Sequence, residues 1–249
     1  MDSGNIGFVL LCAAFVFVMT PGLAMFYGGL VRKKNVVNTM MTSIFIIGIG
    51  IVMWVLFGYS LSFAPSGNAF IGDFRWLGLE GVSLTEGYTD DASIPNMVFS
   101  AFQMMFAVIT PALITGAVAG RMKFKSIFVF TIFWSLIVYY PLAHMVWGQG
   151  GLLGADGIGA LDFAGGDVVH ISSGVSALVL CILLGKRHDY EHSIYRIHNI
   201  PTVVLGASLL MFGWFGFNAG SALAADGLAA HAFMTTGVSA AAAMLSWML

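Results

Sequence analysis

Long apolar runs separated by short polar segments set the pattern of this 249-residue chain. A helix needs roughly 20 mostly apolar residues to cross the hydrocarbon core of a bilayer. Runs of sufficient length lie at residues 5–31, 37–63, 94–120, 126–147, 165–185, 200–222 and 229–249. The pattern therefore predicts an all-α integral membrane protein, a polytopic helix bundle with about seven spans.

The composition supports a membrane protein and excludes several other classes. Hydrophobic residues make up 59% of the chain and charged residues 9%, with a mean hydropathy of +0.91. Soluble domains carry about a quarter charged residues, so this chain lacks the charge to cover a water-facing surface. The net charge of −2, without a basic stripe, excludes a nucleic-acid partner. No Cys/His metal spacing occurs, and we expect no cofactor.

The charged residues indicate how the spans are oriented. Nine of the ten basic residues fall in alternate connections, and these are Arg32, Lys33, Lys34, Arg121, Lys123, Lys125, Lys186, Arg187 and Arg196. Arg75 and five acidic residues share the 64–93 connection. The positive-inside rule makes the basic side cytoplasmic, so we expect the N-terminus outside. Leu249 ends within an apolar run without a flanking charge, so we expect the membrane domain at residues 1–249 to be incomplete at its C-terminus.

Two ionisable residues stand out around the fifth run. Asp162 precedes the run, where its carboxylate can cap a helix start, and the same negative charge would also favour an arriving cation. His170 lies about eight residues further on, or about 12 Å along a helix. Ionisable groups at that depth usually face a bundle interior or a cavity. A functional ring and a structurally satisfied ring both remain open for His170. If buried and neutral, the ring can donate through one nitrogen and accept through the other.

Other residues have two interpretations each. Trp147, at the outer end of the fourth run, fits an interfacial aromatic belt as well as a cation-binding face. Phe106 and Phe217 lie within the third and sixth runs, where plain packing explains them equally well. His144 is expected to be more peripheral than His170. Glycine clusters such as GWFGFNAG at 213–220 favour close helix packing over a ligand role.

Four segments carry a resemblance to a known family. They are FYGGLVRKKNV at 26–36, PLAHMVWG at 141–148, ALDFAGGDVVHISSG at 160–174 and GWFGFNAGSA at 213–222. In this order and on these spans, they resemble the ammonium transporter family (Amt/Mep/Rh), and its Amt branch more than the Rhesus proteins. The resemblance covers the whole chain, but only the first seven of the eleven spans in that family.

The resemblance implies a fold and a mechanism. Family members are homotrimers with a pore through each subunit, and spans one to five and six to ten form an inverted repeat. Ammonium gathers at an outer vestibule, loses its proton, and crosses a hydrophobic pore as ammonia. By position, Trp147 resembles the vestibule's aromatic wall and Ser221 its hydroxyl acceptor. The remaining matches are Phe106 and Phe217 for the stacked gate, Asp162 for the acidic residue below the vestibule, and His170 for the first of two pore histidines.

The resemblance also implies partners and leaves an alternative open. Ammonium or ammonia, with methylammonium, is the expected substrate, and a cytoplasmic regulatory protein is an expected partner. The second pore histidine belongs to a later span, and Gln149 interrupts the family's glycine run on the outer loop. An ammonium sensor would use the same residues as a transporter. An intramembrane enzyme is disfavoured, because H-E-x-x-H, G-x-S-x-G and paired intramembrane aspartates do not occur in the sequence.

Overall fold

The structure is a computed structural model that describes the chain except residues 66–67, 156, 188–189 and 191–193. Within the described residues, seven helical segments are long and apolar enough to cross a membrane. They cover Ser3–Leu30, Lys33–Phe63, Asn96–Val118, Phe124–Trp147, Gly166–Leu184, Ile200–Gly220 and Gly227–Trp247. The predicted runs are confirmed, and their ends differ from these bounds by at most four residues.

The first, third, sixth and seventh spans are each one continuous α-helix in the described chain. They are α1 (Ser3–Leu30), α4 (Asn96–Val118), α8 (Ile200–Gly220) and α9 (Gly227–Trp247). Short 3₁₀ turns, η1 (Lys33–Asn35) and η3 (Leu77–Leu79), lie outside these spans. Both α1 and α4 contain a proline within the helix, Pro21 and Pro111. Packing against neighbouring helices lets membrane helices tolerate the lost backbone bond.

The remaining spans contain a π-helical segment. The second span contains α2 (Val36–Met53), the π segment η2 (Trp54–Gly58) and α3 (Tyr59–Phe63). The fourth span contains α5 (Phe124–Trp134), the π segment η4 (Ser135–Tyr139) and α6 (Tyr140–Trp147). The fifth span contains the π segment η5 (Gly166–Ile171) and α7 (Ser172–Leu184). Single π turns are rare in proteins, and those that occur are often found at functional sites. Hydropathy does not reveal them, because a π turn has the same apolar composition as the helix around it.

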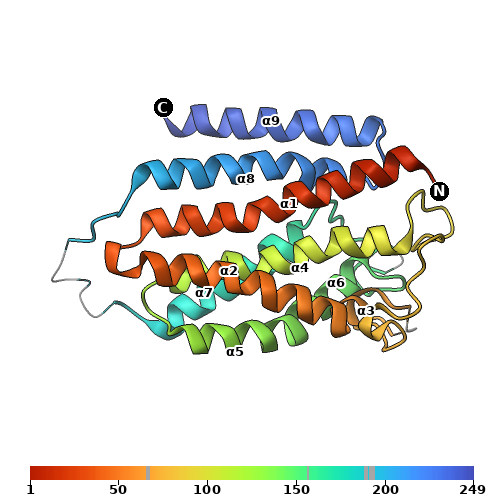
Figure 1. Ribbon diagram of the computed structural model, residues 1–249, viewed down its shortest axis with the longest axis horizontal. Helices are drawn as coiled ribbons and strands as arrows, with labels where there is room; N and C mark the ends of the chain where they lie inside the picture. The colour runs from red at the N-terminus through yellow and green to blue at the C-terminus, as the bar shows by residue number, and fades with distance from the viewer. Residues whose placement is uncertain (66–67, 156, 188–189, 191–193) are drawn as a thin grey trace.

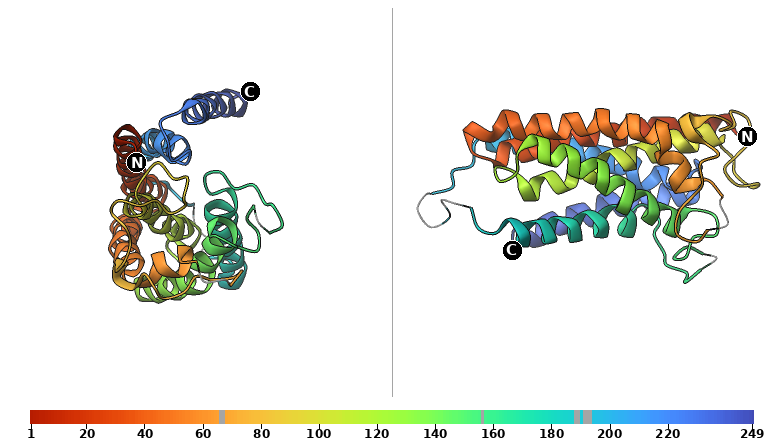
Figure 2. Two further views of the ribbon diagram at one scale, coloured as in Figure 1. Left: turned by 90° about the vertical axis from the view of Figure 1, so that its right-hand side faces the viewer. Right: turned by 90° about the horizontal axis from the view of Figure 1, so that it is seen from below.

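The spans form a bundle with α4 near its centre. Helix α4 is the most buried span of the described chain and α9 the least buried. Helix α1 packs along α8 and also contacts α2 and α4, whereas α9 packs against α8. Figures 1 and 2 show α9 on the outside of the bundle, beyond α8. The interior of the molecule therefore lies around α4.

Glycines bring α1 and α8 into close contact. A Cβ atom added at Gly206 would lie 2.3 Å from the backbone nitrogen of Phe26, and one at Gly216 would lie 2.7 Å from the Phe15 Cβ. Both distances are too short for any side chain larger than hydrogen. The packing interpretation of the GWFGFNAG cluster is confirmed at Gly216, where only glycine fits against α1.

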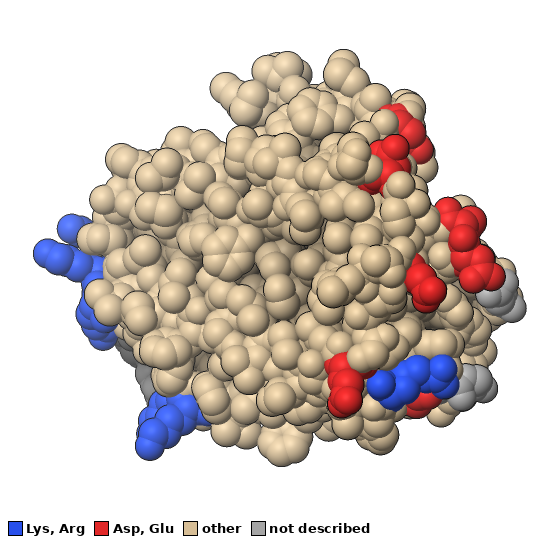
Figure 3. All heavy atoms as spheres, turned by 45° about the vertical axis from the view of Figure 1, so that its right-hand side comes forward, with Lys and Arg blue, Asp and Glu red and all other residues tan. Residues whose placement is uncertain are grey.

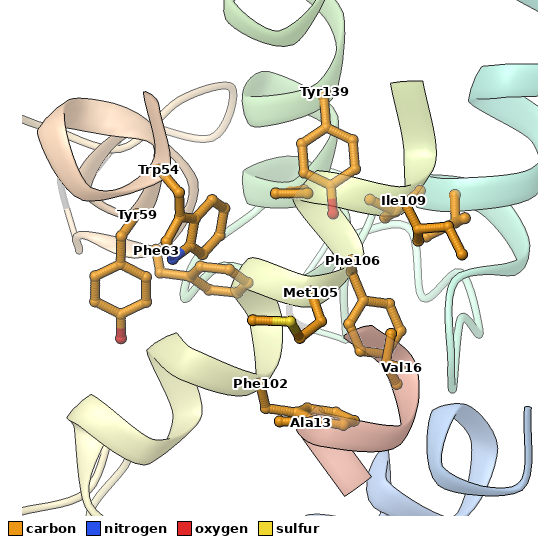
Figure 4. Packing of buried hydrophobic residues seen from close by; sticks show 14 of the residues in the cluster. Ala13, Val16, Trp54, Tyr59, Phe63, Phe102, Met105, Phe106, Ile109 and Tyr139 are labelled. Carbon is orange, nitrogen blue, oxygen red and sulfur yellow. The ribbon is translucent and has the colours of Figure 1, made fainter. Parts of the chain in front are cut away.

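Aromatic side chains fill much of the core around α4. The rings of Trp54 and Phe63, both from the second span, pack edge to face with centroids 6.1 Å apart. The Trp54 indole N–H donates to the Ser100 carbonyl over 3.2 Å. Figure 4 shows Met105 and Phe106 of α4 between Tyr139 on one side and Val16 on the other, with Phe102 beside Ala13. A large apolar cluster of this kind holds α4 in place, and with it the residues that α4 presents to the acidic end of the bundle.

The charged side chains separate to opposite ends of the bundle. Figure 3 shows the basic side chains at one end and the acidic side chains, with one basic group among them, at the other. Arg75 lies 2.7 Å from Asp73, so the two carry a salt bridge at the acidic end. The N-terminus lies at the acidic end and the C-terminus at the basic end (Figure 1). This is the separation of charge on which the predicted orientation rests.

Candidate functional site

A pocket of about 420 Å³ lies at the acidic end of the bundle, and we call it the acidic-end pocket. It is lined by α4 and by residues of the connections before α4, between α6 and η5, and between α8 and α9. Four of the predicted site residues line it, namely Phe106, Trp147, Asp162 and Ser221. Residues separated by more than 100 positions therefore meet at one cavity.

Phe106 forms the inner wall of the acidic-end pocket. Its ring meets Trp147 edge to face, with centroids 6.0 Å apart at 86°, and lies tilted against Phe217 with centroids 4.4 Å apart. Phe106 and Phe217 are each 1% exposed. Phe106 lines the pocket and Phe217 does not. The two rings therefore lie in series, with Phe217 behind Phe106.

Asp162 caps the fifth span with its whole carboxylate. One carboxylate oxygen accepts from the backbone N–H groups of Gly165 and Gly166, and the other accepts from those of Asp167 and Val168, over 2.5–2.9 Å. Gly165 has φ +108°, a conformation that favours glycine, and it turns the chain into η5. The capping interpretation of Asp162 is confirmed.

Trp147 is held at the pocket by the same short segment. Its indole N–H donates to the backbone carbonyl of Asp162 over 2.9 Å. The Trp147 side chain is partly buried and its ring contacts Phe106. Because the indole N–H is already bonded, the ring presents its face or edge to the pocket rather than a donor. This orientation suits contact with a cation better than a contact through the indole nitrogen.

Ser221 lies at the end of α8, on the pocket wall. Its hydroxyl donates to the Phe217 carbonyl over 2.9 Å. A hydroxyl whose proton is used in this way still has lone pairs with which to accept. The Ser221 hydroxyl oxygen at the acidic-end pocket is therefore left able to accept a hydrogen bond, and its predicted role as acceptor stays a prediction.

His170 continues the series beyond Phe217. Its ring stacks on Phe217 with centroids 6.0 Å apart at 25°, and on Trp214 with centroids 5.6 Å apart at 20°. His170 is exposed at the surface of the bundle in the described chain. Its ring has no hydrogen-bond partner among the described residues. Phe106 at the pocket contacts Phe217, and Phe217 contacts His170. The three rings therefore form one line of contacts that leads away from the pocket.

His144 differs from the prediction. It is 0% exposed rather than peripheral. Its Nδ1 lies 3.1 Å from the Ser62 carbonyl oxygen and its Nε2 lies 2.8 Å from the Asn68 carbonyl oxygen. The π segment η4 and helix α6 turn the ring inward against the connection that follows α3, which hydropathy does not reveal. His144 ties that connection to the fourth span.

Three contributors to the region were not predicted from the sequence. Trp214 forms the second stacking face for His170. Gln103 lines the acidic-end pocket one helical turn before Phe106, a spacing that places both on one face of α4. Tyr88 lines the same pocket and stacks on Phe99 with centroids 4.7 Å apart, and burial raises the pKa of its phenol to about 12.

Gln149 supports the wall of the acidic-end pocket. Its backbone N–H donates to the Tyr88 hydroxyl over 3.0 Å, and its side-chain amide donates to the Tyr88 carbonyl over 2.8 Å. The residue that interrupts the glycine run therefore fastens Tyr88 in place. These two bonds let Gln149 affect the shape of the pocket wall.

A sequence model described as the Ammonium Transporter Family matches residues 7–249. An ammonium transporter of Bacillus subtilis is 52% identical to this chain over 249 residues, which cover 100% of this chain and 60% of that protein. The chain therefore spans about three fifths of the length of that relative.

Solved structures share the fold. Candida albicans Mep2 matches with a TM-score of 0.91 and 34% identity, over 100% of this chain and 55% of that one. A structure named Sensor Amt Protein matches with a TM-score of 0.84 and 29% identity, over 98% of this chain and 60% of that one. Both are considerably longer than this chain, so the activity of the complete protein does not follow from the likeness alone.

Proposed function

The chain belongs to the ammonium transporter family, and on this premise we propose that the protein moves ammonium nitrogen across a lipid bilayer. The observation that supports this most directly is the line of contacts from the acidic-end pocket through Phe106 and Phe217 to His170. The proposed substrate is ammonium or ammonia, with methylammonium as an analogue. The protein is an integral multi-pass membrane protein, and the cell membrane is its proposed location.

Ammonium binds first in the acidic-end pocket. The faces of Trp147 and Phe106 attract a small cation through the negative potential of the rings, an interaction worth about 0.5–2 kcal/mol. Ser221 accepts one N–H of the ion. The Asp162 side chain caps the fifth span and also lines the pocket, and a carboxylate at this place favours a cation. Recruitment outside therefore depends on aromatic faces, an acceptor and a nearby charge.

Ammonium then releases one proton to solvent water on the pocket side and passes inward as ammonia. An unpaired cation in an apolar channel has a large desolvation cost, whereas neutral ammonia avoids it. The Phe106 and Phe217 rings separate the pocket from the region of His170. A neutral His170 ring can donate a hydrogen bond to ammonia through one nitrogen or accept one from ammonia through the other. Potassium and sodium are rejected because they cannot lose their charge by releasing a proton.

The full assembly is also part of the proposal. By analogy with the family we propose a homotrimer with one pore in each subunit, and a cytoplasmic regulatory protein as a partner. The residues of this chain form one membrane domain, residues 1–249, which spans about three fifths of the matched relative. The second pore histidine and the later spans belong to the family's remaining length.

An ammonium sensor is a second candidate, favoured by the likeness to the structure named Sensor Amt Protein. The same pocket, gate and histidine serve both functions. A transporter moves ammonium after binding it, whereas a sensor reports occupancy. The two are therefore separated by measuring flux and binding in one preparation.

The test uses proteoliposomes containing either this 249-residue chain or the full-length protein that carries it. Saturable ammonium-dependent uptake or current in the full-length protein, with none in empty liposomes, is the expected result. Binding of ammonium without any flux would favour the sensor. If the full-length protein shows no ammonium binding and no flux, both proposals are contradicted.

A further inference from the structure

Gln103 presents a buried oxygen to the acidic-end pocket. It lies on α4, lines the pocket, and is 9% exposed. Its side-chain oxygen Oε1 is buried without a hydrogen-bond partner among the described residues. No contact with Trp147 or Ser221 uses this oxygen. The pocket therefore contains an acceptor that the rest of the described chain leaves unmatched.

An unpaired buried acceptor is costly, so a native structure usually supplies a partner. Leaving a buried polar group unsatisfied costs about 1–3 kcal/mol. Of the buried side-chain atoms without a partner in the described chain, Gln103 Oε1 alone lines the acidic-end pocket. The Thr39 hydroxyl, for example, is also unpaired but lines a separate small cavity that includes Gly120 at the basic end. The position of Gln103 thus points to a ligand that enters this pocket.

We propose that Gln103 accepts an N–H of the substrate cation and makes the acidic-end pocket prefer ammonium over its methylated analogues. This inference rests on the proposed function of the same pocket. Ammonium carries four N–H donors and no acceptor, so a pocket that offers oxygen lone pairs suits it. Ser221 and Gln103 supply two such acceptors, and the aromatic faces of Phe106 and Trp147 supply the rest.

Methylation supplies the test of this role. Methylammonium has three N–H donors and one methyl group, which cannot donate to Oε1. Ammonium has an N–H group for each of these four contacts, whereas methylammonium must place its methyl group at one of them, either an acceptor oxygen or an aromatic face. Replacing Gln103 by methionine, which has a similar length and no acceptor oxygen at that position, removes a bond to ammonium in every bound orientation. It removes a bond to methylammonium only in those orientations in which one of the three N–H groups faces Oε1.

The experiment measures labelled methylammonium uptake by the full-length protein, and its inhibition by unlabelled ammonium. Wild type, Gln103→Met and Thr39→Val are compared, because Thr39→Val removes an unpaired acceptor far from the pocket. For Gln103→Met we expect the half-inhibiting concentration of ammonium to rise about tenfold, as befits a lost charge-assisted hydrogen bond. The half-saturating concentration of methylammonium should rise by less than about threefold. Both values should be unchanged in Thr39→Val.

Each outcome decides the inference. A fall in the preference for ammonium over methylammonium in Gln103→Met, without one in Thr39→Val, supports it. Equal shifts for both substrates, or none, overturn it. The two concentrations come from the same protein sample, so a change in its amount does not alter their ratio. If Gln103→Met does not accumulate, Gln103→Asn, which withdraws the oxygen by one methylene, is measured in the same way. A wild-type protein without saturable uptake would contradict the proposed function instead.

Discussion

His144 and His170 lie in apolar surroundings on consecutive spans, yet the structure uses them in opposite ways. His144 is completely buried, with both ring nitrogens near backbone carbonyl oxygens of the second span and its following connection. His170 stacks on Trp214 and Phe217, and its ring has no hydrogen-bond partner in the described part of the chain. The first ring lies between two backbone carbonyl oxygens, to at least one of which it can donate, whereas the second has no such partner among the described residues.

The difference separates a structural histidine from a candidate for substrate contact. Buried polar groups are normally hydrogen-bonded, and a ring whose two nitrogens both face backbone carbonyl oxygens leaves no room for a ligand beside them. A ring next to an aromatic gate with its nitrogens unused is suited to a passing amine. Position along a span predicted that His144 is the more peripheral of the two, whereas the burial and the contacts of each ring show that it is the more deeply buried.

The largest expected effect is on stability, at His144. Replacing His144 with leucine leaves the Ser62 carbonyl without its ring partner and should lower the free energy of unfolding by about 2–4 kcal/mol. The measurement is the thermal unfolding of the purified protein in detergent, together with protease cleavage in the connection that follows α3. His231→Leu, at an exposed histidine of α9, is the matched control and should change little. A His144→Leu protein as stable as this control would contradict the structural role.

The next effect is on transport, at His170. Replacing His170 with alanine in the full-length protein should reduce ammonium uptake about tenfold or more, or weaken the exclusion of potassium, because a pore hydrogen bond is lost. Because the ring is exposed in this chain, its stability should change by less than about 1 kcal/mol. Uptake of labelled methylammonium and potassium currents provide the readout, with His231→Ala as the control. Unchanged uptake and selectivity would return His170 to a structural role.

A smaller effect is expected at the pocket, through Trp147. Replacing Trp147 with leucine should weaken the apparent affinity for ammonium about threefold to tenfold, because a cation-binding ring face is removed. Trp147→Phe keeps a ring face and loses the N–H bond to the Asp162 carbonyl. Its apparent affinity for ammonium should therefore lie between those of wild type and Trp147→Leu. Uptake at low ammonium concentrations measures both. Equal uptake at low ammonium in all three proteins would contradict recruitment by this ring.

The smallest effect concerns the connection that His144 fastens. The Arg75 guanidinium donates a hydrogen bond to Asp73 and lowers the pKa of that carboxyl below its ordinary value. A lowered pKa in the folded protein means that the ionised carboxyl stabilises the fold above pH 4 and that this contribution is lost as the pH falls further. Wild type should therefore lose slightly more thermal stability than Asp73→Asn between pH 5 and pH 3. Equal losses would show that the ion pair contributes nothing measurable.

Much of the fold was predictable from the sequence because its cause is local. Each membrane span must satisfy its backbone hydrogen bonds within itself, so the apolar runs set the position and order of the helices. The separation of basic and acidic residues into alternate connections is equally local. The Asp162 cap belongs to this group, because its four N–H partners lie within six residues.

Only the tertiary structure decided how the candidate site is arranged. Phe106, Trp147, Phe217 and His170 come from four different spans, and their contacts depend on helix packing that no single run specifies. The resemblance suggested these residues, but it did not reveal that the His144 ring contacts carbonyls 76 and 82 positions away, or that Gln103 Oε1 has no hydrogen-bond partner among the described residues. Hydropathy and spacing describe neighbours along one helix, whereas these partners lie on segments distant in sequence. Bonding between such segments exists only once the bundle has formed.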